Sequence, residues 1–117
     1  DPALVLYASP RSALAAAGKA LGLRVAAEAF ADRAYLADGT LAPRSMPGSV
    51  IAGVEDVVTR AMRMAIERTV VAMDGTLVQI DADSLCIHGD TAGAPTLAAW
   101  IRAGLQSSGV DVRAPNA

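Results

Sequence analysis

The feature that most constrains the fold is a strand–helix–strand pattern at the start of the chain. Residues 3–8 and 24–28 are two runs of mostly apolar residues, and each has the character of a buried strand. Between them, residues 10–21 predict a short helix, for which Ser9-Pro10 is expected to supply the N-cap and the first helical position. Because the turns between these elements are short, the pattern is typical of a βαβ unit with parallel strands.

Later segments continue this alternation of strands and helices. Residues 54–67 and 94–107 carry apolar side chains at helical spacing. Asp74-Gly75 separates two short apolar runs, which is the pattern of a β-hairpin. Residues 110–114 are expected to form a short last strand or an irregular tail. The strands that we expect to be parallel neighbours in one sheet, with the three helices outside it, span residues 3–8, 24–28 and 84–88.

A long polar segment interrupts this regular pattern. Residues 28–45 follow neither helical nor strand spacing, and Gly39 and Pro43 lie within them. A loop of this length in a compact domain is usually functional or disordered. Its mixture of positive and negative side chains favours a functional segment, and a solvated connector with internal salt bridges is the other interpretation.

Composition restricts the class of protein. Hydrophobic residues make up 53% and charged residues 19% of the 117 residues, so the chain can bury the core of one small domain. The net charge of −2, without a basic run, gives nucleic acid no electrostatic footprint. No apolar run reaches transmembrane length, so no membrane partner is expected. The single cysteine, Cys86, excludes an internal disulfide and fits a reducing compartment, and we therefore expect a cytoplasmic location.

Polar residues follow three of the predicted strands at the points where they end. Ser9 follows the first strand, Glu28 ends the second with Asp32 shortly after it, and His88 ends the third with Asp90 two residues further on. In parallel α/β architectures, the carboxyl ends of the strands are where ligand-binding groups collect. We therefore predict that the four ionisable residues of this group share one site.

The segment His88-Gly-Asp90 offers acid–base chemistry. Histidine is the commonest general base, although a lone histidine beside a carboxylate is also often structural. Gly89 is expected to let the backbone turn sharply or approach a ligand closely. Cys86 is expected to be buried, because free cysteine is among the most buried residue types. One histidine with its neighbouring carboxylates is a poor metal-ligand set, so no metal ligand is predicted.

Two arginines of the long polar segment could bind an anion. Arg33 and Arg44 suit bidentate binding of a substrate carboxylate or a phosphate. The alternative is pairing with Glu28, Asp32 or Asp38 inside the loop. Neither a Walker A motif nor a dinucleotide-binding glycine pattern is present, so this segment alone does not support nucleotide binding.

Three segments together resemble a known family. The segments Glu28-Ala-Phe-Ala-Asp-Arg-Ala-Tyr35, Asp38-Gly-Thr-Leu-Ala-Pro-Arg-Ser45 and Cys86-Ile-His-Gly-Asp90 closely resemble the LamB/YcsF family, the A subunits of bacterial 5-oxoprolinase. The first segment is long and specific, whereas His-Gly-Asp alone would be a weak signal. The resemblance runs from the first predicted strand to the last predicted helix and covers the C-terminal half of the family's sequence.

This resemblance implies a fold, a reaction and a set of site residues. The implied fold is α/β, the C-terminal half of an irregular seven-stranded (β/α) barrel of the glycoside hydrolase/deacetylase type, with residues 1–117 as a single partial domain. The implied reaction is the ATP-dependent opening of 5-oxoproline (pyroglutamate) to glutamate. Partner subunits B and C would use ATP to activate the lactam by phosphorylation. The positions implied as catalytic are Glu28, Asp32, His88 and Asp90, and those implied as substrate-binding are Arg33, Tyr35, Arg44 and Ser45.

Two other interpretations follow from the same sequence. One is a metal-dependent, deacetylase-like hydrolase, which is based on fold analogy. The other is an inactive truncated chain that acts only as an interaction half. The chain starts without methionine and enters a strand after two residues, so we expect further sequence upstream of Asp1. Because a half barrel leaves a sheet edge uncovered, we expect the partner to be an N-terminal half or a self-complementing second copy.

Overall fold

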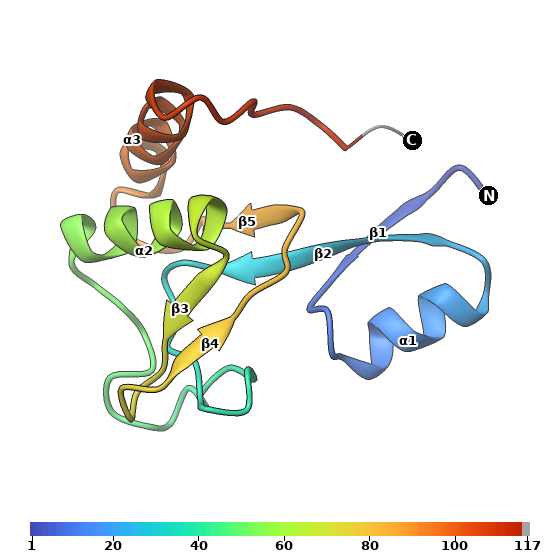
Figure 1. The fold of residues 1–117 in the computed structure, drawn as a ribbon, viewed down its shortest axis with the longest axis horizontal. Helices are drawn as coiled ribbons and strands as arrows, with labels where there is room; N and C mark the ends of the chain where they lie inside the picture. Colours follow the sequence, from blue (N-terminus) through green and yellow to red (C-terminus); the bar gives the residue numbers. More distant parts are fainter. Residues whose placement is uncertain (116–117) are drawn as a thin grey trace.

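A computed structural model describes residues 1–115 and shows a mixed α/β architecture (Figure 1). In chain order the elements are β1 (Val5–Ala8), α1 (Ala13–Ala20), β2 (Arg24–Phe30), α2 (Val54–Ile66), β3 (Thr69–Val71), β4 (Leu77–Gln79), β5 (Ser84–Cys86) and α3 (Ala94–Ser107). The three predicted helices and the predicted β-hairpin, formed by β3 and β4, are all confirmed.

The predicted parallel sheet is also confirmed. Its strand order is β1-β2-β5, and both pairings are parallel. The central strand β2 is long, so its residues from Arg24 to Ala27 pair with β1, whereas Glu28 to Phe30 pair with β5. Because β2 and β5 run in the same direction, the polar residues that follow them emerge at the same end of the sheet.

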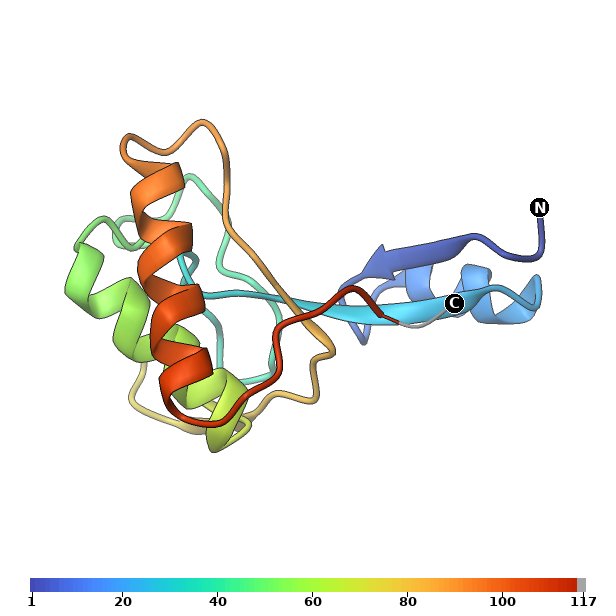
Figure 2. The same ribbon diagram turned by 90° about the horizontal axis from the view of Figure 1, so that it is seen from above.

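The helices pack against the apolar side of the strands. Gly18 of α1 lies against Leu6 and Val25, and a methyl group added to this glycine would come within 2.5 Å of the Leu6 side chain. Ala29 lies on the same face of β2 as Val25, because side chains an even number of residues apart on a strand share a face. It belongs to the buried core, against which Leu85 packs. Helices α2 and α3 lie side by side, whereas α1 lies apart from them beside β1 and the first half of β2 (Figures 1 and 2).

The long loop between β2 and α2 has no regular element, as predicted, but it starts later than expected, because Glu28 to Phe30 belong to β2. It spans residues 31–53 and is folded back on itself by two single-residue antiparallel bridges, Arg33 with Val50 and Tyr35 with Leu41. These bridges give the loop a fixed conformation, which places its polar side chains relative to the end of β2.

The predicted start of α1 is wrong. The N-cap is Ser12, whose hydroxyl accepts the Ala15 backbone N–H at 3.1 Å, so the helix begins at Ala13. Pro10 instead lies in a preceding turn, closed by a hydrogen bond of 3.0 Å from the Ser12 N–H to the Ser9 carbonyl. Both serines can cap a helix, and the proline two residues before Ser12 fits the turn equally well.

The predicted end of the last strand of the sheet is also wrong. The last strand of the sheet ends at Cys86, so His88 lies beyond it. Residues 110–114 form an irregular tail, because no strand pairs with them in the range that the structure describes. Gly89 lies in a turn closed by a hydrogen bond of 3.1 Å from the Thr91 N–H to the His88 carbonyl, although its φ is not left-handed and a methyl group added there would contact no atom of the described residues within 4 Å.

Unpaired sheet edges lead to a first prediction. Within residues 1–115, β1 and β5 each pair along one edge only, and Leu4 and Tyr7 at β1 are exposed. Such edges and apolar side chains favour association with another chain. We expect the chain of residues 1–117, produced alone, to self-associate, so that its mass in sedimentation velocity rises with concentration. A single monomeric species over the whole concentration series would contradict this expectation.

Candidate active site

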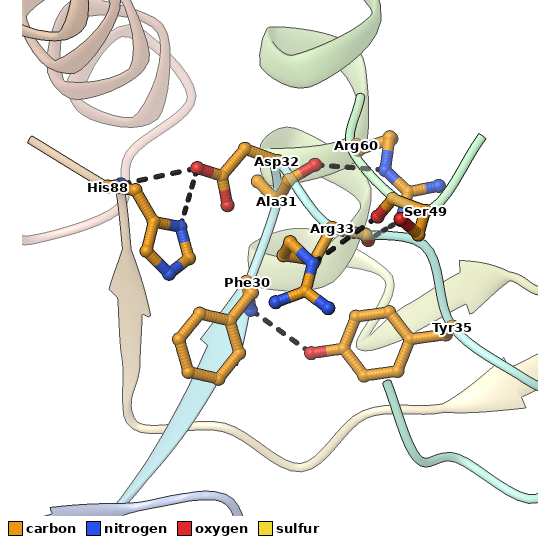
Figure 3. Close-up of polar contacts among 8 residues, drawn as sticks. All are labelled: Phe30, Ala31, Asp32, Arg33, Tyr35, Ser49, Arg60 and His88. Carbon is orange, nitrogen blue, oxygen red and sulfur yellow. Dashed lines mark hydrogen bonds and ion pairs between the residues drawn. The ribbon is translucent and has the colours of Figure 1, made fainter. Parts of the chain in front are cut away.

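The ends of β2 and β5 bring an aspartate and a histidine into direct contact (Figure 3). Asp32 and His88 each lie two residues beyond a paired position, because Phe30 is aligned with Cys86 across the two strands. The Oδ2 atom of Asp32 accepts the His88 backbone N–H at 3.2 Å and lies 2.8 Å from His88 Nδ1. The side chain of Asp32 is 2% exposed and that of His88 is 25% exposed. A buried carboxylate therefore supports an imidazole that still reaches the surface.

This geometry assigns the roles of the two imidazole nitrogens. Asp32 Oδ2 already accepts the backbone N–H of His88, so it is an acceptor toward the ring as well. In the neutral ring, Nδ1 therefore carries the proton and donates it to Asp32, which leaves Nε2 free to accept one. A nucleophile-activating histidine oriented by a carboxylate has this same arrangement.

Phe30 restricts the imidazole further. Its ring stacks on that of His88, with the ring centroids 5.6 Å apart and the planes 19° from parallel. Because the ring is held by a stack on its face and by a hydrogen bond at its edge, it has little freedom to rotate. The other carboxylate oxygen of the pair, Asp32 Oδ1, is buried and has no hydrogen-bond partner among the described residues.

Arg33 does not have the role expected from the sequence. Its side chain is buried, and it donates hydrogen bonds to the backbone carbonyls of Ser49 at 3.3 Å and Ala42 at 2.8 Å. Within residues 1–115 it forms no ion pair with an acid. Arg33 therefore holds the long loop closed behind Asp32.

Tyr35 also contacts the backbone of β2. Its buried hydroxyl accepts the Phe30 N–H at 3.0 Å, at the point where β1 no longer runs beside β2 (Figure 3). Burial raises the pKa of the Tyr35 hydroxyl above its ordinary value, since desolvation outweighs the effects of the Phe30 hydrogen bond, Arg60 and Arg33. Tyr35 thus acts as a hydrogen-bond acceptor for the strand end that carries the candidate site.

Removing this hydroxyl should weaken the fold. In Tyr35→Phe the Phe30 N–H loses its acceptor, and we expect a loss of about 1–2 kcal/mol in the free energy of unfolding, the scale for a partly buried unpaired donor. Urea unfolding followed by circular dichroism would measure it. Tyr7→Phe, at a tyrosine that is 44% exposed, is the control and should change stability by less than about 0.5 kcal/mol. Equal effects of the two substitutions would contradict the role given to Tyr35.

Glu28 and Cys86 lie on the sheet face that also carries Phe30. Glu28 and Phe30 are two residues apart on β2, so their side chains point to the same face. Cys86 is the partner of Phe30 on β5. Cys86 is half-buried, so the expectation of full burial is wrong. Burial raises the pKa of the Cys86 thiol to about 11, and the charge and hydrogen bond of Glu28 add to this effect. Cys86 is therefore a neutral thiol beside the Glu28 carboxylate at neutral pH.

The raised pKa can be tested through thiol reactivity. Alkylation of Cys86 by iodoacetamide should accelerate around pH 11, above the ordinary value of 9.0. Glu28→Gln removes the second cause of the shift, so its profile should move to lower pH. The thiol ionises at lower pH in the unfolded chain than in the folded one. The free energy of unfolding should therefore fall as pH rises from 9.0 to about 11, and Cys86 should have no such effect below pH 9.0. A wild-type profile centred at 9.0 would contradict the placement of Cys86.

Glu28 and Tyr35 border a cavity of about 300 Å³. Its other walls are residues 9–12 before α1, the loop around Gly39 and the end of β4. A larger hollow of about 640 Å³ lies between α2, α3 and residues 110–115, but none of the site residues predicted from the sequence lines it. The smaller cavity is the better candidate for a substrate-binding space, because Glu28 and Tyr35 line it and a small polar molecule fits its volume, whereas Asp32 and His88 do not line either cavity.

Three of the predicted site residues lie apart from the Asp32–His88 pair. Arg44, Ser45 and Asp90 are exposed, and within residues 1–115 none of them forms a hydrogen bond or an ion pair with the pair. The sequence had not indicated the roles of Phe30, of Ser49, or of Arg60 on α2. These residues act through ring stacking and backbone carbonyls, which no spacing of polar residues reveals.

The described part of the chain offers neither a metal-ligand cluster nor a membrane-spanning helix. In residues 1–115, no three histidine, cysteine, aspartate or glutamate side chains are grouped so as to hold a metal ion. Over the same range, every helix is too short or too polar to cross a membrane.

Fold and site together define a class of protein: an α/β chain with a parallel sheet whose strand ends carry a carboxylate-oriented histidine. The sequence profile of the LamB/YcsF family matches residues 1–117, and the chain belongs to this family. It is 52% identical over 114 residues to the 5-oxoprolinase A subunit of Heliobacterium modesticaldum, and 49% identical over 114 residues to that of Thermus thermophilus. These matches cover 97% of the chain, and 45% and 46% of the two relatives.

A solved structure supports the same relationship. The crystal structure of the lactam utilization protein from Thermus thermophilus superposes with a TM-score of 0.91 at 47% sequence identity. The match covers 98% of this chain and 45% of that one. The chain therefore spans a little under half the length of the relatives that it matches.

Proposed function

We propose that the full-length protein is a hydrolase subunit that opens the lactam 5-oxoproline to glutamate. The observation that carries this proposal is the contact of Asp32 with His88, a base-and-orienter pair at the carboxyl end of a parallel sheet. Relatives at about half identity are named as A subunits of 5-oxoprolinase, and a structural neighbour is named for lactam utilization. A cyclic amide is therefore the substrate class that both the pair and the names of the relatives support.

The proposed chemistry is a general-base hydrolysis. His88 Nε2 takes a proton from a water molecule, whose oxygen bonds to the lactam carbonyl carbon. The ring C–N bond then breaks, and the ring nitrogen receives a proton, which the protonated His88 returns. Asp32 keeps the ring oriented and stabilises its positive charge between these two transfers.

The remaining site residues have proposed binding roles. Glu28 borders the cavity of about 300 Å³ and is proposed to accept a hydrogen bond from the lactam N–H. Arg44 and Ser45, which are exposed, are proposed to bind the substrate carboxylate or a departing phosphate, and Asp90 to assist proton transfer. Tyr35 contributes to the same cavity wall.

ATP and partner subunits complete the proposal. A five-membered lactam resists hydrolysis, and phosphorylation of its carbonyl oxygen would make the carbonyl carbon a better electrophile. We propose that subunits corresponding to B and C transfer a phosphoryl group from ATP to this oxygen. In the full-length protein, attack of water on the activated carbon and cleavage of the ring C–N bond then give γ-glutamyl phosphate, and a second water molecule releases glutamate and inorganic phosphate. The word "subunit" in the names of the relatives supports an assembly of this kind.

We also propose that residues 1–117 form the C-terminal portion of an irregular seven-stranded barrel. The parallel sheet, covered by helices on its apolar side, supports this architecture. The opposite face of the sheet, which carries Glu28, Phe30 and Cys86, would then line the barrel interior.

A reconstituted assay tests the function. The full-length protein is combined with its co-produced partner subunits, ATP and 5-oxoproline, and glutamate is measured by chromatography. We expect glutamate to form only when ATP and all subunits are present. Absence of glutamate from a fully assembled, ATP-hydrolysing complex would overturn the proposal.

A further inference from the structure

Arg60 of α2 binds the backbone on both sides of Asp32. Its Nε–H donates to the Ala31 carbonyl at 3.0 Å, and its Nη2 donates to the Arg33 carbonyl at 2.6 Å (Figure 3). Asp32 is the residue between these two acceptors. One guanidinium therefore fixes both peptide groups that determine where the Asp32 side chain points, and it does so from a helix rather than from the loop itself.

The position of Arg60 also has an electrostatic consequence. Burial lowers the pKa of the Arg60 guanidinium, and the nearby Tyr35, Asp56 and Asp32 oppose this effect. Within residues 1–115 the guanidinium forms no ion pair, so its charge is available to the carboxylate beside it. Among the described residues Asp32 Oδ1 is buried without a hydrogen-bond partner, and an unpaired buried acceptor of this kind is costly.

We propose that Arg60 is a positioning residue, which sets the direction of Asp32 and, through Asp32, the tautomer and orientation of His88. The inference rests on the proposed function for its kinetic consequence, but its structural content does not depend on the substrate. Three steps connect the residues: Arg60 to the carbonyls flanking Asp32, Asp32 to His88 Nδ1, and His88 Nε2 to the reacting water.

Two substitutions separate the geometry of the guanidinium from its charge. Arg60→Met keeps most of the length of the side chain but removes both hydrogen bonds and the charge. Arg60→Lys keeps the charge but replaces the planar fork with one ammonium, which is a poor substitute at a bidentate site. The matched control is Arg63→Met one turn further along α2, because the side chain of Arg63 is 40% exposed and its one ion pair within residues 1–115 is with Glu67.

The nitrogen NMR signals of the His88 ring report its tautomer. If Arg60 only stabilised the fold, its replacement would not change these signals. The ring signals of His88 in the full-length protein can be assigned by their loss in His88→Gln. In the wild type and in Arg63→Met we expect the Nδ1-protonated tautomer. In Arg60→Met we expect a shift toward a mixture of tautomers, with Arg60→Lys between the two.

The kinetic arm uses the reconstituted assay. We expect Arg60→Met to lower kcat by about a hundredfold, the scale of a misplaced catalytic group, with little change in KM. Arg60→Lys should lose less, and Arg63→Met should keep the wild-type rate. A kcat that follows the NMR tautomer across the series supports the inference.

Other outcomes decide the inference as well. A folded Arg60→Met protein with the wild-type histidine signals and a near-normal kcat overturns it. Should Arg60→Met fail to fold, Arg60→Lys decides by the same two measurements. A complex that never opens 5-oxoproline, but whose histidine tautomer changes in Arg60→Met, would refute the proposed function and leave the positioning role standing.

Discussion

Replacing His88 with alanine in the full-length protein is expected to lower glutamate formation by about a hundredfold or more, the scale of lost general acid–base catalysis. The imidazole is the group whose free Nε2 can take a proton from water, because Nδ1 is occupied by Asp32. The substitution also removes the stacking partner of Phe30. His88 lies beyond the end of β5 and is 25% exposed, so its removal should cost little core packing.

His88→Asn is the matched control for this experiment. The asparagine amide can donate to Asp32 much as Nδ1–H does, but it supplies no basic nitrogen. We therefore expect His88→Asn to restore any stability that is lost in His88→Ala without restoring turnover. Circular dichroism and thermal unfolding would verify that both variants are folded. Near-normal turnover by a folded His88→Asn protein would make the histidine structural and direct the search to Glu28.

The sheet and helices could be predicted because their signals are local. The first strand is an uninterrupted apolar run, the strand at residues 84–86 begins with Ser84 and continues with the apolar Leu85 and Cys86, and α2 has apolar residues at helical spacing with charges opposite. The predicted ends of helices are less accurate where two residues could both act as the N-cap. Ser9 and Ser12 are both competent N-caps, and only the folded chain shows that Ser12 is used.

The approach of Asp32 to His88 was also open to prediction. Asp32 follows one predicted strand by a few residues and His88 ends another, and parallel neighbours bring such positions to one end of the sheet. What the sequence did not reveal is the function of the arginines. Arg33 and Arg60 bind backbone carbonyls, and every residue has such a carbonyl, so no pattern of side chains indicates which arginine will find one.

Loop conformation explains the remaining differences. The sequence indicates polar residues from Glu28 to Ser45 but not the direction that each faces. Two single-residue bridges turn Arg33 and Tyr35 inward, whereas Arg44 stays exposed. A polar residue in a loop of this kind serves the fold or the ligand according to the path of the backbone, which depends on contacts with distant segments such as β2 and α2.

Replacing Asp32 with asparagine is the second change with a large expected effect, and we expect it to lower the rate by about a hundredfold. The amide oxygen should take the place of Oδ2, because an amino group there would face the His88 backbone N–H at 3.2 Å. The amino group then occupies the place of Oδ1, where no hydrogen-bond partner is present among the described residues. The geometry around His88 is thereby kept, and what is lost is the negative charge that stabilises the protonated ring.

The Asp32→Asn substitution distinguishes the effect of the carboxylate charge from the effect of the His88 tautomer. In a triad where asparagine reverses the tautomer of the histidine, the loss in kcat is about 10⁴-fold. Here the backbone N–H of His88 keeps an acceptor in place, so the wild-type tautomer should persist in the nitrogen NMR signals of Asp32→Asn while turnover falls. A reversed His88 tautomer with a much larger loss in kcat would show that the His88 backbone N–H does not determine the orientation of the substituted amide. Turnover within about threefold of the wild type, a difference of less than about 1 kcal/mol in the barrier, would show that the carboxylate charge has no part in catalysis.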